Sequence, residues 1–305
     1  MTAALGQRVQ EYLRLRRALG FRLEREGTVL AQFAAYLEEK GAATITAEHA
    51  IAWAQLPQGV DPVNWSHRLT AVRSFAAWLR TTDPAAEIPP RGVFPGQGKR
   101  PVPFIWSPGD IARLAAACGS LRPRMRAATY TALFGLIAVT GIRIGEALAI
   151  PADGIDLDAG LLPVSPAKSR CERILPLQPS TVEALAEYDS LRRRRHPAAA
   201  TFFVSIRGTA LCYGPVLQAF RQACAVAGLH GPGPRPRIHD LRHSFAVTTL
   251  LEWYRSGEDV AAQMPALSGY LGHVSPEGTY WYLSAVPELM QLAAARLARK
   301  EGGDE

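Results

Sequence analysis

The sequence predicts a mainly α-helical protein with one small antiparallel β-sheet, divided into two domains. Apolar residues recur at helical spacing along most of its 305 residues. Residues 154–177 instead carry short alternating apolar runs separated by Asp, Gly and Pro, which is typical of a small antiparallel sheet. Residues 83–103 contain six prolines and three glycines without a helical period, which indicates a linker. We therefore expect a helical domain over 1–82 and a second domain, with the sheet, over 104–305.

The first domain is predicted to be entirely helical, with a basic exterior. Residues 5–19 place apolar side chains at helical spacing, and residues 26–40 repeat the pattern. Thr46 can cap a third helix that runs through Trp53. A fourth helix is expected over about 63–81, where the apolar residues again face one side.

The second domain begins with a helix start, in which a capping Ser107 precedes Pro108 at the first helical position. A short strand is expected at 202–204, between helices. The helices of this domain are expected at about 108–118, 124–139, 143–150, 180–194, 213–227, 239–254, 258–271 and 287–299.

Composition and charge narrow the class of protein. Hydrophobic residues make up 48% of the chain and charged residues 20%, so it can build a core and is not disordered. No apolar stretch approaches the ~20 residues of a membrane helix, and the start lacks a signal peptide, so we expect a soluble cytoplasmic protein with no membrane partner. The net charge of +7 suits a polyanion such as nucleic acid. The four cysteines are scattered and form no CxxC pair, so neither a disulfide framework nor a zinc site is indicated.

Two clusters of charged residues lie in the first half of the second domain. In TGIRIGEAL (140–148), Arg143 and Glu146 are one helical turn apart. The guanidinium could hold a phosphate through two parallel hydrogen bonds, with the carboxylate orienting it from behind. The second cluster is the basic hairpin tip around Lys168, ahead of the apolar run ILPL. A lysine there could reach DNA and donate a proton.

Two further clusters follow near the C-terminus. In HDLRH (239–243), His239 and Arg242 face the same side of a helix and could converge on one phosphate. The other is LGH (271–273), followed by TYWYL (279–283). Each of the four clusters has an ordinary explanation when taken alone, such as a surface salt bridge, a solvated turn, a helix-capping histidine or an aromatic core.

Taken in order, the four clusters resemble those of the tyrosine recombinase (phage integrase) family, over roughly residues 104–290. Tyr282 takes the place of the nucleophile because it lies nine residues after His273. Tyr280 is the local competitor. The resemblance implies a catalytic set with two supporting residues: Arg143, Lys168, His239, Arg242, His273 and Tyr282, supported by Glu146 and His243.

The resemblance also implies the reaction, which needs no metal, cofactor or ATP. Arg143 and Arg242 would clamp the DNA phosphate. His239 would take the tyrosine proton as Tyr282 attacks, and Lys168 would protonate the leaving deoxyribose oxygen. The products would be a 3′-phosphotyrosine link and a free 5′-hydroxyl, which then attacks the link on a partner strand.

The family further implies how the domains and subunits work together. The first domain resembles a core-binding domain that closes with the catalytic domain as a two-domain clamp around double-stranded DNA. A tetramer on DNA is expected, and the amphipathic helix 287–299 packs either on a neighbouring subunit or on its own domain. The stretch between Arg242 and His273 is longer than is common in the family. The tail TYWYLSAVPEL is similar to integrases of transposon-like elements, so integration, excision, transposition and chromosome resolution all stay open.

Two other functions fit the same residues. A type IB topoisomerase-like enzyme shares the tyrosine and the Arg, Lys and His set, but it relaxes supercoils as a monomer. The small helical first domain and the C-terminal helix favour recombination over relaxation. A DNA-binding accessory protein without catalysis is the second alternative, and the complete set of catalytic residues argues against it.

Overall fold

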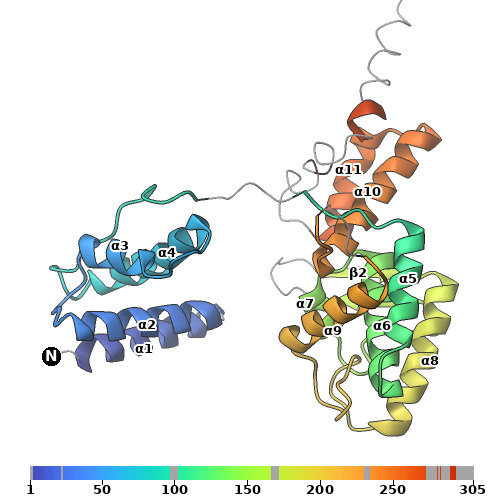
Figure 1. Cartoon of the computed structure of the whole chain (residues 1–305), viewed down its shortest axis with the longest axis horizontal. Helices are drawn as coiled ribbons and strands as arrows, with labels where there is room; N and C mark the ends of the chain where they lie inside the picture. Colours follow the sequence, from blue (N-terminus) through green and yellow to red (C-terminus); the bar gives the residue numbers. More distant parts are fainter. Residues whose placement is uncertain are drawn as a thin grey trace, which may run out of the picture. The chain divides into compact units, whose positions relative to one another are not determined.

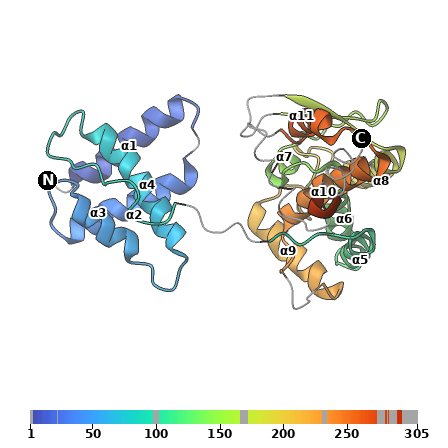
Figure 2. The same cartoon turned by 90° about the horizontal axis from the view of Figure 1, so that it is seen from above.

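The computed structural model describes residues 3–21, 23–96, 102–165, 172–229, 234–272, 280, 282 and 289–292. Contacts divide the chain into two compact units, Met1–Arg100 and Pro101–Glu305 (Figures 1 and 2). The boundary falls inside the segment that the sequence predicts as a linker. Apart from one short hairpin, the regular structure of the described residues is helical, as predicted (Figure 1).

The first unit forms its own helical core. Its described helices are α1 (Ala3–Ala18), α2 (Glu24–Glu39), α3 (Ala47–Gln55) and α4 (Pro62–Leu79). Each lies within a few residues of a predicted range. Thr46 caps α3 as expected, because its side chain accepts a hydrogen bond from the His49 backbone N–H. Phe33, Trp53 and Phe75 are buried at the centre, where apolar area removed from water stabilises the unit.

The first half of the predicted linker belongs to this unit. Ala86 is buried, and Phe94 packs against the helical core with its ring 5.7 Å from that of Trp65. Arg73 donates hydrogen bonds to the carbonyls of Pro89 (2.9 Å) and Pro90 (2.7 Å). Proline-rich backbone forms no helix of its own, so side chains from α4 satisfy its carbonyls instead.

The second unit is built around the long buried helix α6, which packs against α5, α8 and α10. Its capping box at Ser107 and Asp110 confirms the predicted start of α5. The helices described in this unit are α5 (Pro108–Gly119), α6 (Arg124–Thr140), α7 (Ile144–Leu148), α8 (Pro179–Arg195), α9 (Tyr213–Val226), α10 (Ile238–Ser256) and α11 (Val260–Leu271).

The predicted sheet is a two-stranded antiparallel hairpin of β1 (Leu161–Val164) and β2 (Arg173–Pro176). Leu161 lies opposite Pro176, and Val164 lies opposite Arg173, so the strands lead directly into the hairpin tip. Lys168 falls in the sequence between the two strands and lies outside the described residues.

The strand predicted at 202–204 is not formed, and this prediction was wrong. Thr201 and Val204 form only isolated bridges, to Pro151 and Ala210, and no continuous ladder is present in this segment. Phe202 and Phe203 are apolar because they are buried in the core of the unit. A short apolar run cannot by itself distinguish a strand from a buried turn.

Two further expectations meet the structure only in part. Of the predicted helix 287–299, residues 289–292 are described as helical, with Leu289 buried. The rest of that helix lies outside the described residues. Within the described part of the chain, no helix is long and apolar enough to cross a membrane.

Candidate active site

The site begins at the turn between α6 and α7. Gly141 ends α6 at φ +63°, a left-handed conformation that favours glycine, and Arg143 is the N-cap of α7. The Arg143 guanidinium donates from Nη1 to Glu146 Oε1 (3.0 Å) and from Nη2 to the carbonyl of Gly272 (2.7 Å). The predicted pairing of Arg143 with Glu146 is therefore present in the structure. The Arg143 side chain keeps 28% of its surface exposed, so it can still meet a ligand.

Arg242 lies on α10 and is almost completely buried, with 1% of its surface exposed. Its Nη1 donates to the carbonyl of Gly141 (2.7 Å) and its Nη2 to the carbonyl of Leu271 (2.6 Å). Burial, followed by the charge of Arg143, lowers the pKa of Arg242 to about 10. The side chain therefore stays protonated at neutral pH, and two backbone oxygens fix its orientation.

Three consecutive carbonyls at the end of α11 each accept a hydrogen bond from a different arginine. Tyr270 accepts from Arg173 (2.8 Å), Leu271 from Arg242 (2.6 Å) and Gly272 from Arg143 (2.7 Å). The last carbonyls of a helix lack partners within the helix and carry the negative end of its dipole, so they suit cationic side chains. The motif LGH therefore has a structural role in addition to supplying His273.

Glycine is favoured at position 272. The residue caps α11 at φ +66°, and a Cβ there would lie 2.8 Å from Arg173 Nη1 and 3.4 Å from Arg143 Nη1. Such a Cβ would displace the two guanidinium groups or the helix end.

Arg173 is a residue of this site that the sequence analysis did not identify. It donates from Nη1 to Glu146 Oε1 (3.2 Å) and from Nη2 to Glu146 Oε2 (2.8 Å). Its one sequence signal is its position, directly before the apolar run of β2. Burial raises the pKa of the Glu146 carboxyl, but the Arg173 hydrogen bonds and the contacts with Arg143 outweigh it and hold that pKa below its usual value.

His239 and His243 lie one turn apart on α10, with ring centroids 4.5 Å apart. Desolvation, and then the charge of Arg242, lower the pKa of His239 to about 4. The residue still presents a substantial part of its surface to solvent, which weakens the consequences of this shift. Both causes favour the neutral form of the imidazole.

Tyr282 is buried, with 2% of its surface exposed, and its hydroxyl lies 3.1 Å from Nδ1 of His243. The charge of Tyr282 also raises the pKa of Arg242, so the two groups interact electrostatically. Tyr280, the competing tyrosine, is 49% exposed. The structure thus brings Tyr282 together with His243 and Arg242. The other predicted residues, Lys168 and His273, lie outside the described residues.

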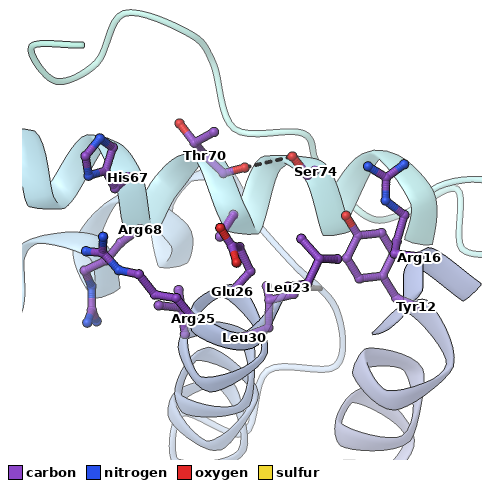
Figure 3. Close-up of a pocket in the computed structure, with 12 residues that line it drawn as sticks. Tyr12, Arg16, Leu23, Arg25, Glu26, Leu30, His67, Arg68, Thr70 and Ser74 are labelled. Atoms are coloured by element: carbon purple, nitrogen blue, oxygen red, sulfur yellow. Dashed lines mark hydrogen bonds between the residues drawn. The ribbon is translucent and has the colours of Figure 1, made fainter. Parts of the chain in front are cut away.

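A second basic feature lies in the first unit, as a pocket of about 390 Å³ between α1, α2 and α4 (Figure 3). Arg25 and Arg68 lie at one end of it, and Arg16 lies at the other, with Glu26 between them (Figure 3). The Arg68 guanidinium stacks on Trp53, 3.7 Å from the ring centroid, and donates to the Trp53 carbonyl (3.1 Å). Three arginines against one carboxylate make this pocket suitable for an anion.

The described residues of the second unit define the class of site. Two arginines are fixed in place before any ligand binds, as electrostatic catalysis of phosphoryl transfer requires. The buried Tyr282 interacts electrostatically with Arg242, and its hydroxyl lies 3.1 Å from a histidine. Fixed cations, a histidine and a tyrosine are the groups that covalent phosphoryl transfer to a tyrosine would need.

Comparison with known proteins assigns the chain to a family. Residues 107–288 match the phage integrase family. The chain is 41% identical over 305 residues to integrase/recombinase y4rB of Sinorhizobium fredii (strain NBRC 101917 / NGR234), across 96% of this chain and 97% of that protein. It is 30% identical over 225 residues to tyrosine recombinase XerC of Azotobacter vinelandii (strain DJ / ATCC BAA-1303), across 74% and 70% of the two chains.

Solved structures show the same fold. A lambda integrase tetramer bound to a Holliday junction aligns with a TM-score of 0.63 at 17% identity, across 91% of this chain and 76% of that one. The chain belongs to the phage integrase family of tyrosine recombinases, and the resemblance read from the four motifs is confirmed.

Proposed function

We propose that this protein is a site-specific DNA recombinase that cuts and rejoins strands through a 3′-phosphotyrosine link to Tyr282. The observation that carries the proposal is the position of the Tyr282 hydroxyl, 3.1 Å from His243, together with the electrostatic interaction of Tyr282 with the buried Arg242. Arg242 and Arg143 are held by backbone carbonyls, so they need little reorganisation when a phosphate arrives.

In the proposed cleavage step, the Tyr282 oxygen forms a bond to phosphorus as the bond from phosphorus to the deoxyribose O5′ breaks. The tyrosine proton passes to a histidine, and among the described residues His243 lies within hydrogen-bond distance of the hydroxyl. This differs from the role expected for His239, whose ring lies one helical turn from that of His243. Lys168 supplies the proton to O5′. Attack by a free 5′-hydroxyl reverses the step on a partner strand.

The first unit is proposed to bind the same duplex, so that the two units close around it as a clamp. Its pocket lined by Arg16, Arg25 and Arg68 offers cations for the phosphate backbone, and the net charge of +7 agrees with a polyanionic partner. The active assembly is proposed to be a cytoplasmic tetramer on DNA, as in the lambda integrase structure. In that assembly the helix 287–299 would pack on a neighbouring subunit.

A covalent-capture experiment tests the function. Short nicked duplexes, tiled through the DNA that flanks the gene, are incubated with the full chain, denatured and separated on a gel. Wild type is expected to form a covalent protein–DNA adduct on one or more duplexes, and Tyr282→Phe is expected to form none. Tyr280→Phe is the matched control and should keep the adduct, because the proposal assigns the nucleophile to Tyr282.

Other results of these experiments would indicate a different nucleophile or a different function. If Tyr280→Phe lost the adduct and Tyr282→Phe kept it, Tyr280 would be the nucleophile instead of Tyr282. Relaxation of a supercoiled plasmid without strand exchange would indicate a topoisomerase. Tight binding to a duplex without any adduct would indicate an accessory DNA-binding protein.

A further inference from the structure

Arg173 is the third arginine at the end of α11, and its contacts differ from those of the other two. It is the first residue of β2, so it lies at the base of the hairpin. Its Nε donates to the Tyr270 carbonyl (2.8 Å), and both of its terminal nitrogens donate to the Glu146 carboxylate. The Arg173 side chain is 9% exposed, compared with 28% for that of Arg143. Of these two arginines, Arg143 is therefore the one that can contact a phosphate, whereas Arg173 is largely shielded from solvent.

The Glu146 carboxylate is the link between the two arginines. Its Oε1 accepts from Arg143 Nη1 (3.0 Å) and Arg173 Nη1 (3.2 Å), and its Oε2 accepts from the Arg143 backbone N–H (2.9 Å) and Arg173 Nη2 (2.8 Å). A carboxylate offers about four acceptor sites, so this one is fully used. Without Arg173, half of these bonds are lost and a buried negative charge, with 1% of its side chain exposed, depends on Arg143 alone.

The same contacts join three separate parts of the chain. Arg173 connects the hairpin strand to α7 through Glu146 and to the end of α11 through Tyr270. The hairpin tip carries Lys168, and His273 directly follows the end of α11. A single buried side chain therefore contacts the strand that follows Lys168 in sequence, the helix α7 and the helix end that precedes His273.

We propose that Arg173 is a positioning residue that aligns Arg143 through the shared Glu146 carboxylate and fixes the base of the Lys168 hairpin against the end of α11. The proposal rests on the proposed recombinase function. Arg173 itself does not touch the DNA. Three of its donor groups are used within the protein, and its side chain is almost completely buried.

The test compares Arg173→Met and Arg173→Lys with wild type, using the nicked duplexes that wild type captures. The single-turnover rate of adduct formation and the affinity for the same duplex are both measured. Arg173→Met should slow adduct formation by roughly 10- to 100-fold, the loss expected for charge-assisted hydrogen bonds. Its DNA affinity should stay within about 3-fold, because Arg173 makes no DNA contact. Arg173→Lys should recover part of the rate, since its ammonium can still reach one acceptor.

The chain offers a matched control in Arg192. It is buried, donates from Nε to Asp189 (3.0 Å) and from Nη2 to the Ala152 carbonyl (3.0 Å), and so repeats the acid-and-carbonyl contacts of Arg173 outside the site. Arg192→Lys should lower the melting temperature without changing the rate of adduct formation at temperatures well below melting. A purely structural Arg173 would behave in the same way, and that result would overturn the proposal.

A double-mutant cycle tests the route through Glu146. If Arg173 acts through that carboxylate, adding Arg173→Met to Glu146→Gln should slow the reaction by less than about 3-fold further. If the double variant's loss in rate equals the product of the two single-variant losses, the two residues act separately, and this overturns the proposal. If Arg173→Met does not fold, the test relies on Arg173→Lys. A wild-type rate of adduct formation in Arg173→Lys would then overturn the proposal. A wild type without any adduct would instead refute the recombinase function itself.

Discussion

Replacing Gly272 by alanine should disturb the site at the point where its arginines meet. The new Cβ would lie 2.8 Å from Nη1 and 3.0 Å from Cζ of Arg173, and 3.4 Å from Nη1 of Arg143. Contacts below 3.0 Å are not tolerated, so the Arg173 guanidinium must move away from Glu146 or the end of α11 must shift. Either movement also changes the carbonyl that accepts from Arg143, because that carbonyl belongs to residue 272 itself.

Two contributions set the expected size of the effect. The left-handed backbone at φ +66° costs an alanine about 1–2 kcal/mol in the free energy of unfolding. Weakening one charge-assisted hydrogen bond to Glu146 or Arg143 adds about 1.5–3 kcal/mol. If this second contribution is also lost from the transition state, adduct formation slows by roughly 10- to 100-fold.

Gly228 provides the control for this prediction. It has the same φ of +66°, but a Cβ there would meet no atom within 4 Å. Gly228→Ala should therefore show the backbone cost alone in urea unfolding, with an unchanged rate of adduct formation. Equal rates for Gly272→Ala and Gly228→Ala would refute the idea that close packing on Gly272 aligns the arginines.

Three further predictions concern charge. Arg242→Lys should lower the free energy of unfolding by about 1–3 kcal/mol in urea titrations and abolish adduct formation, because an ammonium cannot bind both carbonyls that the buried guanidinium reaches. His239 has a lowered pKa of about 4, so the unfolded state binds more protons between about pH 4 and 6.5. Stability should therefore fall as the pH drops through that window, and less steeply in His239→Asn; parallel pH profiles would contradict this. Arg25→Ala should reduce the slope of log affinity against log salt by about one for duplex DNA, whereas Arg14→Ala, outside the pocket, should not.

Much of the fold could be predicted from local sequence signals. Helical spacing and caps such as Thr46 and Ser107 fixed the described helices to within a few residues, because these signals act between neighbours in the chain. The segment around Phe202 and Phe203 was wrongly expected to be a strand. Its apolar character reflects burial, which local periodicity cannot separate from a strand.

The sequence by itself determined the family, through the order and spacing of Arg143, His239, Arg242 and Tyr282, and this needed no coordinates. Only the tertiary structure decided how those residues are held. The carbonyls of Tyr270, Leu271 and Gly272 have no side-chain signature, since every residue carries a carbonyl, so their role as acceptors for three arginines could not be predicted. Arg173 was missed for the same reason: its partner Glu146 lies 27 residues away in sequence, and their pairing depends on how the hairpin packs against α7.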